Sequence, residues 1–305
     1  MLNRNAVALI FSIFITSSLA QDFEKVEINK VKVSEGVYML IGSGGNIGVS
    51  IGEDGIILID DQFAQLTEKI KAALAEISAG RIRFVLNTHW HYDHTGGNEP
   101  LGEAGALIVA HTNTRKRMTT EQFIEFFKLK QPPSPEIALP VVTFTDAVTL
   151  HLNGDEIHAF HVDHAHTDGD AVVFFRKANV VHMGDIYFAG GYPFIDVPNG
   201  GSINGVISAA DRVLAMIDKD SKVIPGHGSL SDRDGLKEYR DMLVTVRDQI
   251  MAQIATGKTL AEVLASKPTT KFDESQKQWM PADGFVQILY DELSKERTSS
   301  QRVKQ

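Results

Sequence analysis

The 305-residue sequence contains no cysteine. It therefore has no disulfide framework, no thiolate nucleophile and no thiolate ligand, so any transition metal bound here must use histidine and carboxylate side chains. Positive charge is also scarce, because 30 Lys and Arg stand against 39 Asp and Glu, and no basic run occurs. An acidic chain of this kind is a poor candidate for binding nucleic acid or anionic membranes.

A long hydrophobic run is found only at the amino terminus. Arg4 is followed by an apolar run from Ala6 to Thr16, and the small residues Ser18 and Ala20 precede polar sequence. This layout predicts a secretory signal peptide over residues 1–20, cleaved near Ala20. We therefore expect a periplasmic or secreted protein without stable membrane insertion after cleavage. The alternative is an uncleaved anchor, although the run is short for a bilayer span of about 20 residues.

The remaining sequence alternates between strand-like and helical segments. Short apolar runs with glycine punctuation predict strands from Val31 onward, and two helical segments, over 67–78 and 203–218, each follow a set of strands. Two sheets packed together with helices outside are the arrangement that this order favours. No Pro- or Ser-rich linker separates independent domains, so we expect one domain over residues 21–265. Residues 266–305 are predicted to be a C-terminal helical extension, with one amphipathic helix near 284–295, and a flexible tail.

The segment over residues 112–138 differs from its surroundings. Phe123, Phe126 and Phe127 fall on a predicted helix, which Pro132, Pro133 and Pro135 then end. A segment of this length is either an ordinary surface connection or a lid or wall over a binding cleft.

The motif THWHYDHTGG carries the clearest chemical signal. His89, His91, Asp93 and His94 lie within six residues, directly after a predicted strand. If all four bound one zinc ion, they would complete its tetrahedron and leave no open position for water or substrate. Dividing them between two neighbouring metal ions relieves this crowding but requires further ligands.

Three more candidate ligands also follow predicted strands. They are His166 in HTDGD, Asp185 in GDIYF and His227 in PGHG. In layered α/β folds the strand ends are where sites are built, since the sheet fixes the side chains and the loops leave room for a substrate. The other six histidines are interpreted as structural or surface residues; they are His111, His151, His158, His161, His164 and His182.

Together these motifs resemble the metallo-β-lactamase superfamily, from about Val31 to Ala265. THWHYDHTGG is similar to its H-x-H-x-D-H motif, and HTDGD, GDIYF and PGHG are similar to its later motifs in the expected order. GIILIDD resembles its early strand, which ends in an acidic residue, here Asp60. The resemblance implies an α/β fold of the αββα sandwich type, with two mixed β-sheets and external helices.

The resemblance also implies a role for each motif residue. It implies that His89, His91 and His166 bind a first zinc ion, that Asp93, His94 and His227 bind a second, and that Asp185 bridges the two. A metal-bound hydroxide would be the nucleophile, and Asp93 would have a catalytic role as well, by orienting it or by carrying a proton. Asp60 would support the imidazole ligands from behind.

Several residues differ from those typical of particular branches of the superfamily, and these differences indicate which branches the sequence resembles most. The absence of cysteine excludes the branch that uses a thiolate at the second metal, and Asp185 favours the lactonase, thioesterase and phosphodiesterase branches. His91 stands where flavodiiron proteins have Glu, which favours zinc over redox iron. Phe188 stands where lactonases place a substrate-contacting tyrosine. Tyr187 is expected to point to the opposite face, and Phe188, Tyr192 and Phe194 either line the cleft or belong to a packed loop.

The leading hypothesis is an enzyme, a dinuclear zinc hydrolase that cleaves a carboxyl derivative (a β-lactam, lactone, ester or thioester) of a small-molecule substrate. One alternative is an iron-dependent oxygenase of sulfur compounds or a metal-binding accessory protein of a periplasmic oxidation system. A phosphodiesterase is another alternative, but it requires Lys or Arg near the cleft, and the motif loops have none.

Overall fold

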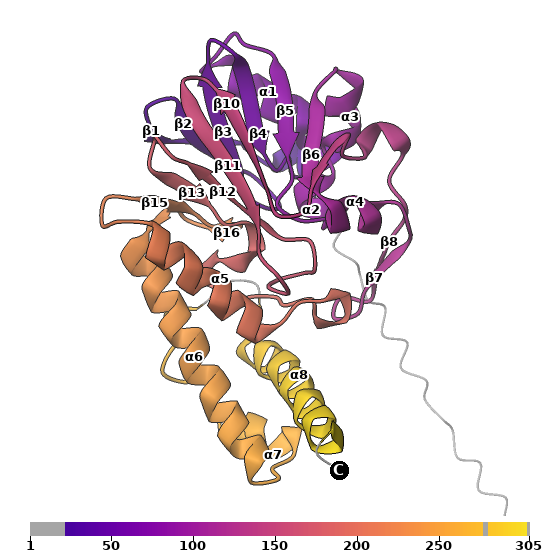
Figure 1. Cartoon of the computed structure of the whole chain (residues 1–305), viewed down its shortest axis with the longest axis vertical. Coiled ribbons are helices and arrows are strands. Elements are labelled where there is room, and N and C mark those ends of the chain that lie inside the picture. The colour runs from indigo at the N-terminus through magenta and orange to yellow at the C-terminus, as the bar shows by residue number, and fades with distance from the viewer. Residues whose placement is uncertain (1–21, 277–279, 304–305) are drawn as a thin grey trace, which may run out of the picture.

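The fold was obtained as a computed structural model, which describes residues 22–276 and 280–303. The predicted signal peptide, residues 1–20, lies outside the described residues, as do parts of the predicted C-terminal tail. Two mixed sheets face each other, and helices cover their outer sides (Figure 1).

The first sheet has seven strands in the order β1-β2-β3-β4-β5-β6-β9. Its strands are β1 (Asn29–Ser34), β2 (Val37–Ile41), β3 (Ile47–Gly52), β4 (Gly55–Ile59), β5 (Ile82–Leu86), β6 (Leu107–His111) and β9 (Val142–Phe144). The first four are antiparallel, and β4, β5, β6 and β9 run parallel to one another.

The second sheet has six strands in the order β10-β11-β12-β13-β15-β17. Its strands are β10 (Ala147–Leu152), β11 (Asp155–His161), β12 (Ala171–Phe175), β13 (Val180–His182), β15 (Lys222–Ile224) and β17 (Ser231–Asp232). Only the β13–β15 pair within this sheet is parallel. A separate pair, β14 (Phe188–Ala189) and β16 (His227–Gly228), joins two of the site loops.

Alternating side chains explain why the strands are apolar on both faces. In β4, Ile57 and Ile59 enter the core between the sheets, while Leu58 enters the core beneath the helices of the first sheet. In β12, Val173 belongs to the core between the sheets and Val172 to the core on the outer side of the second sheet. Because successive residues of a strand face opposite sides, such runs produce a strand buried on both faces.

Helices complete the outer layers. The helices are α1 (Thr67–Ala75), α2 (Tyr92–Thr95), α3 (Asn98–Glu103), α4 (Thr112–Met118), α5 (Ile203–Met216), α6 (Arg233–Ala255), α7 (Leu260–Ala265) and α8 (Ala282–Val303). The 3-10 turns are η1 (Phe23–Lys25), η2 (Ala64–Leu66), η3 (Glu136–Ala138), η4 (Gly184–Ile186) and η5 (Val197–Asn199). Helices α1 and α3 cover the first sheet, and α5 and α6 share a core with the second. The αββα sandwich expected from the sequence is confirmed.

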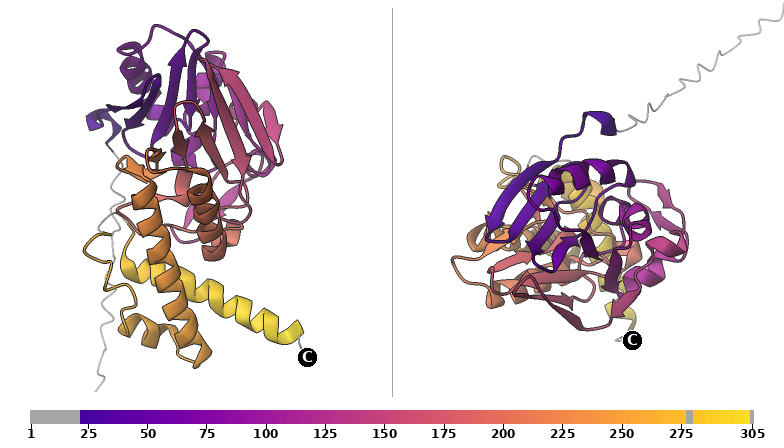
Figure 2. Two further views of the ribbon diagram at one scale, coloured as in Figure 1. Left: turned by 60° about the vertical axis from the view of Figure 1, so that its left-hand side comes forward. Right: turned by 90° about the horizontal axis from the view of Figure 1, so that it is seen from above.

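The C-terminal helices extend away from the sandwich, as Figure 1 and the left view of Figure 2 show. The predicted amphipathic helix near 284–295 is the longer α8, which packs against α6 and α7. Its residues Phe285, Leu289 and Leu293 are buried in the same core as the outer side of the second sheet. No helix among the described residues has the length and apolar character needed to cross a membrane.

The prediction of a helix carrying Phe123, Phe126 and Phe127 is wrong. The segment instead forms a hairpin of β7 (Gln122–Ile124) and β8 (Leu129–Gln131). Gln122 and Ile124 are buried while Phe123 is exposed, which is the period of a strand rather than a helix. Arg117 donates a hydrogen bond to the Gln122 side chain, so tertiary contacts outweigh the helical spacing of the aromatic residues.

Candidate metal centre

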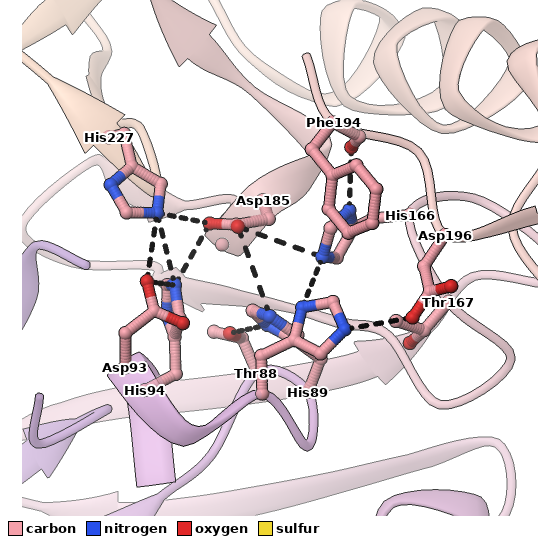
Figure 3. Close-up of polar contacts among 12 residues, drawn as sticks. Thr88, His89, Asp93, His94, His166, Thr167, Asp185, Phe194, Asp196 and His227 are labelled. Carbon is pink, nitrogen blue, oxygen red and sulfur yellow. Dashed lines mark hydrogen bonds and ion pairs between the residues drawn. The ribbon is translucent and has the colours of Figure 1, made fainter. Parts of the chain in front are cut away.

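The seven predicted ligands lie close together in two groups, and Figure 3 labels all of them except His91. His89 and His91 follow β5, Asp93 and His94 belong to the short helix α2, and His166 lies between β11 and β12. Asp185 lies in η4 after β13, and His227 opens β16 after β15. Since β4, β5, β13 and β15 all end near this point, the sheets hold the loops that carry these side chains in place.

His89, His91 and His166 form what we call the first ligand group. Together with Asp185, they offer ligand atoms that all lie within 4.8 Å of one another. The Nε2 atom of His166 is 2.9 Å from Nδ1 of His91 and 3.6 Å from Oδ2 of Asp185. The Nε2 atom of His89 is 3.9 Å from the same Asp185 oxygen.

Asp93, His94 and His227 form the second ligand group, whose ligand atoms also lie within 4.8 Å of one another. The Nε2 atom of His227 is 3.4 Å from Oδ2 of Asp93 and 3.4 Å from Nε2 of His94. The Oδ1 atom of Asp185 is 3.0 Å from Nε2 of His94 and 3.3 Å from Nε2 of His227. Asp185 therefore stands between the groups, with Oδ2 toward the first and Oδ1 toward the second (Figure 3).

Asp60 supports the second ligand group from behind, at the end of β4. This carboxylate is fully buried, and it accepts hydrogen bonds from the backbone N–H and the hydroxyl of Thr88, both at 2.7 Å. Its Oδ2 is also 2.8 Å from Nδ1 of His94. Because a carboxylate accepts there, the hydrogen of His94 is held on Nδ1 and the lone pair of Nε2 points into the centre.

The rings of the first ligand group also have partners on their outer nitrogens. Thr88 Oγ1 lies 3.0 Å from Nδ1 of His89, and the Phe194 carbonyl oxygen lies 2.8 Å from Nδ1 of His166. Asp196 Oδ2 lies 3.0 Å from Nε2 of His91. The carboxylate and the carbonyl can only accept, so they place hydrogens on the outer nitrogens of His91 and His166 and leave the inner nitrogens free to bind a cation.

Burial and neighbouring charges shift the histidine pKa values in opposite directions in the two ligand groups. Burial, together with neighbouring histidines, lowers the pKa of His89 well below its usual value, and burial lowers the pKa of His166 to about 4. In the second group burial also opposes charge, but the carboxylates of Asp185 and Asp93 prevail and raise the pKa of His227 to about 9. His94 and His227 in turn hold the pKa of Asp93 at about 2 against the effect of its burial.

These features fit a pair of divalent cations. Nε2 of His89 is buried and makes no hydrogen bond to any described residue. The inner nitrogens of His91 and His166 lie 2.9 Å apart, and their outer partners leave both with lone pairs directed inward. Two lone pairs at this distance repel each other, and a cation bound between them would be coordinated by both nitrogens. The set of imidazole and carboxylate donors suits divalent transition metals.

A cleft of about 420 Å³ opens onto this centre. Four of the predicted ligands line it, namely His91, Asp93, Asp185 and His227, and aromatic and aliphatic side chains make up much of the remaining lining. The lining residues are Ser43, Gly44, Phe63, His91, Tyr92, Asp93, Ile124, Phe127, Asp185, Phe194 and His227. The β7–β8 hairpin contributes Ile124 and Phe127, so the segment 112–138 forms part of the cleft wall.

The aromatic residues after Asp185 have different positions. Phe194 lines the cleft. Phe188 is buried behind the centre, where its ring stacks on His227 with centroids 5.1 Å apart. Tyr187 points away and its hydroxyl lies 2.7 Å from Ser231 Oγ, and Tyr192 donates a hydrogen bond to Asp273. Of the predicted wall residues, Phe194 alone reaches the cleft.

The six histidines interpreted as structural or surface residues lie outside both ligand groups. His182 is buried with its Nε2 atom 3.0 Å from the carbonyl oxygen of Asn46, and His158 contacts the hydroxyl of Thr149. His111 and His161 stack with centroids 3.7 Å apart.

Sequence reasoning did not identify Thr88, Asp196 and the Phe194 carbonyl as partners of the ligand rings. Asp196 is 105 residues from His91, so no local spacing reveals the contact. Asn199 joins this carboxylate to the hairpin, since its side-chain amide donates to Asp196 and to the carbonyl of Phe123. Arg117 completes the link by donating to the Asn199 side chain.

Comparison with known proteins agrees with this geometry. Residues 41–227 match the sequence model of the Metallo-beta-lactamase superfamily. The chain is 23% identical to the metallo-beta-lactamase type 2 of Bacteroides fragilis, over 77% of this chain and 94% of that protein. It is 27% identical to the hydroxyacylglutathione hydrolase of Pelagibacter ubique (strain HTCC1062), over 48% of this chain and 52% of that enzyme.

Solved structures show the same fold. A metallo-beta-lactamase from Pontibacter korlensis superposes with a TM-score of 0.59 and 19% identity, covering 71% of this chain and 99% of that one. The inverting sec-alkylsulfatase Pisa1 from Pseudomonas sp. superposes with a TM-score of 0.68 and 16% identity, covering 87% of this chain and 50% of that one.

Proposed function

Because the chain belongs to the metallo-beta-lactamase superfamily, whose members are metallo-hydrolases, we propose that it is an exported dizinc hydrolase of carboxyl derivatives. Its substrate is a small molecule with a lactam, lactone, ester or thioester bond. The observation that carries the proposal is the position of Asp185, whose two oxygens face the two ligand groups separately. That position suits a carboxylate bridging two metal ions.

Zinc is the metal that the donors favour. Five imidazoles and two carboxylates, without a thiolate, match the ligands of catalytic zinc. A single iron ion bound by His89, His166 and Asp185 would leave the second ligand group without a function. The pKa of Asp93, about 2, keeps this carboxylate ionised and ready to bind a cation at neutral pH.

The metal pair, when bound, supplies an activated water and polarises the carbonyl oxygen of the substrate. The chain's own residues orient the reaction. Asp93 lines the cleft, where it can orient the attacking water and carry a proton to the leaving group. Asp60, Thr88 and Asp196 hold the imidazole rings and thereby fix the directions of their free lone pairs.

The cleft favours a carboxyl substrate over a phosphodiester. A phosphodiester keeps its negative charge, and sites that bind phosphate use Arg or Lys. No Arg or Lys is among the residues that line the cleft. The hydrolase from Bacteroides fragilis is named for β-lactams and that from Pelagibacter ubique for an acylglutathione, so bonds of both kinds belong in the substrate test.

Export rests on residues 1–20, with their apolar run after Arg4 and the small residues before Gln21. Expression of the full chain in a bacterium with a periplasm, followed by fractionation and N-terminal sequencing, tests it. A mature protein beginning near Gln21 in the periplasm supports export. An unprocessed chain in the cytoplasm contradicts it.

The function is tested with one purified sample in two assays. Metal content by mass spectrometry and hydrolysis of a cephalosporin, a lactone, a thioester, an ester and a phosphodiester are measured together. We expect two zinc ions per chain and turnover of at least one carboxyl derivative. His89→Ala should abolish turnover, and His151→Ala, which alters an exposed histidine outside the centre, should not. Turnover that survives in His89→Ala would contradict the proposal.

A further inference from the structure

The β7–β8 hairpin presents aromatic side chains beside the metal centre. We call Phe126, Phe127 and Phe194 the aromatic wall, because their rings contact one another. The centroids of Phe127 and Phe194 are 4.9 Å apart, those of Phe126 and Phe127 are 5.1 Å apart, and those of Phe126 and Phe194 are 5.8 Å apart. The wall is therefore one continuous apolar surface.

The aromatic wall begins at the ligand rings and ends in solvent. At its inner end Phe194 is buried, and its ring stacks on His91 with centroids 5.9 Å apart. At its outer end Phe127 is 45% exposed and Phe126 is 39% exposed. Exposed large apolar side chains gathered at one place cost solubility, and such patches commonly mark a binding surface.

Two further aromatic residues line the cleft. They are Phe63 and Tyr92, with ring centroids 5.4 Å apart. Ile124 adds an aliphatic side chain from the hairpin. A substrate chain bound in the cleft therefore contacts aromatic and aliphatic side chains as well as the carboxylates and imidazoles of the metal centre.

No Lys or Arg is among the residues that line the cleft. The nearest cation along the hairpin is Lys128, which is largely exposed and lies within 4.0 Å of Glu125. It lines a neighbouring cavity together with the outer residue Phe126 and with Phe194, whereas Phe127 and Phe194 line the cleft itself. A substrate whose chain carries a carboxylate would place that charge against aromatic carbon. Burying an unpaired charge in this way is costly.

We propose that the cleft selects uncharged carboxyl esters or thioesters with an apolar acyl chain, which lies along the aromatic wall. This inference rests on the proposed hydrolase function and names its substrate class. In the reaction the oxygen of water bonds to the acyl carbon, and the bond from that carbon to the alcohol oxygen or thiol sulfur breaks. The leaving group takes a proton, and the products are a carboxylic acid and an alcohol or thiol.

The test compares p-nitrophenyl esters that differ only in the acyl group. Hexanoyl has four more methylene groups than acetyl, and each methylene group that is buried is worth a factor of about four in binding. We expect kcat/KM for the hexanoyl ester to exceed that for the acetyl ester by about tenfold or more, because burial of only about two of the four additional methylene groups gives a factor of this size. The p-nitrophenyl monoester of adipic acid has the same four methylene groups but a carboxylate in place of the terminal methyl group, and it should react at least about tenfold more slowly than the hexanoyl ester.

Two phenylalanines of the hairpin provide matched variants. Phe127→Ala removes part of the aromatic wall, while Phe123→Ala removes a side chain of similar exposure, 44%, that does not line the cleft. Phe127→Ala should lower the ratio of hexanoyl to acetyl kcat/KM about tenfold, and Phe123→Ala should leave that ratio within about twofold of wild type. Phe127→Arg should raise the rate of the adipic monoester relative to the hexanoyl ester.

The outcomes separate this inference from the proposed function. If the wild type hydrolyses esters without preferring hexanoyl, or if Phe127→Ala leaves the preference intact, the inference is overturned and the hydrolase remains. If no carboxyl derivative is hydrolysed, the proposed function fails, and binding of 2-heptanone, an uncharged analogue with the same chain, tests the cleft by calorimetry. Binding to wild type that is lost in Phe127→Ala then supports the apolar cleft, and failure of the wild type to bind overturns it.

Discussion

Replacing Asp60 by Asn should weaken metal binding at the second ligand group although Asp60 lies outside both groups. Asp60 has a φ of +64°, in the left-handed region that Asn tolerates, so the substitution adds little backbone strain. The carboxylate accepts from the Thr88 backbone N–H on one oxygen, and from the Thr88 hydroxyl and His94 on the other. An amide can only accept on one side, so one of these arrangements must change.

Both orientations of the new amide are costly. If its NH2 group faces the Thr88 N–H, two buried donors oppose each other, which costs about 1–3 kcal/mol of stability. If it faces His94, the ring hydrogen moves from Nδ1 to Nε2 and removes the lone pair aimed at the metal. Loss of such supporting contacts lowers metal affinity about 10- to 100-fold, or about 1.4–2.8 kcal/mol.

A zinc titration in competition with a chromophoric chelator measures this effect. We expect one of two zinc ions to bind Asp60→Asn with the lowered affinity and the other to bind as in wild type. Asp61→Asn is the control, because burial raises the pKa of the Asp61 carboxyl, and an amide has the shape of the protonated acid. Two zinc ions bound to Asp60→Asn with wild-type affinity would refute the role assigned to this carboxylate.

Three further predictions concern the metal centre and its supports. Against the effect of burial, the carboxylates of Asp185 and Asp93 raise the pKa of His227 to about 9 and hold the pKa of His94 well above its usual value. At neutral pH zinc must therefore displace up to two protons from the second group, and its affinity there should fall about 10- to 100-fold per pH unit as pH falls. Burial lowers the pKa of His166 to about 4 and that of His89 well below its usual value, so affinity at the first group should fall less steeply, and equal slopes for both ions in zinc titrations at pH 6, 7 and 8 would contradict this. Asp196→Ala removes the partner of His91 and should lower the affinity of the first zinc about 10- to 100-fold in the same titration, while the second is unaffected. Arg117→Met removes the hydrogen bonds to Gln122 and Asn199 and the ion pair with Asp168, and should cost about 1–3 kcal/mol in denaturant unfolding. Lys116→Met, at an exposed neighbour, should change the unfolding free energy by less than about 0.5 kcal/mol.

The sandwich and the convergence of the ligands could be predicted because both follow from local patterns. Apolar runs such as that of β4 are strands buried on both faces, and turns placed after strands bring their side chains to one end of the fold. Asp60 was expected from the resemblance of GIILIDD to the early strand of the metallo-β-lactamase superfamily, which ends in an acidic residue. Contacts between segments far apart in the sequence could not be predicted, because no local pattern indicates them. The contact between Asp196 and His91 is an example.

The β7–β8 hairpin could not be predicted for a related reason. The phenylalanines at 123, 126 and 127 have helical spacing, and their local preference does not include the bonds that Arg117 and Asn199 make with the hairpin. These bonds hold Gln122 and Phe123 in an extended backbone. Tertiary contacts decided the structure, and with it the side chains that face the cleft.

Zinc stoichiometry measured together with turnover tests the central claim most directly. Chelator-stripped protein is titrated with zinc while hydrolysis of an uncharged ester is followed, in wild type and in Asp185→Ala. If Asp185 bridges two ions, wild-type activity should rise to a plateau at two zinc ions per chain, and Asp185→Ala should bind zinc weakly and remain inactive. Full activity without added metal, or wild-type zinc binding and turnover in Asp185→Ala, would contradict a bridged dizinc centre.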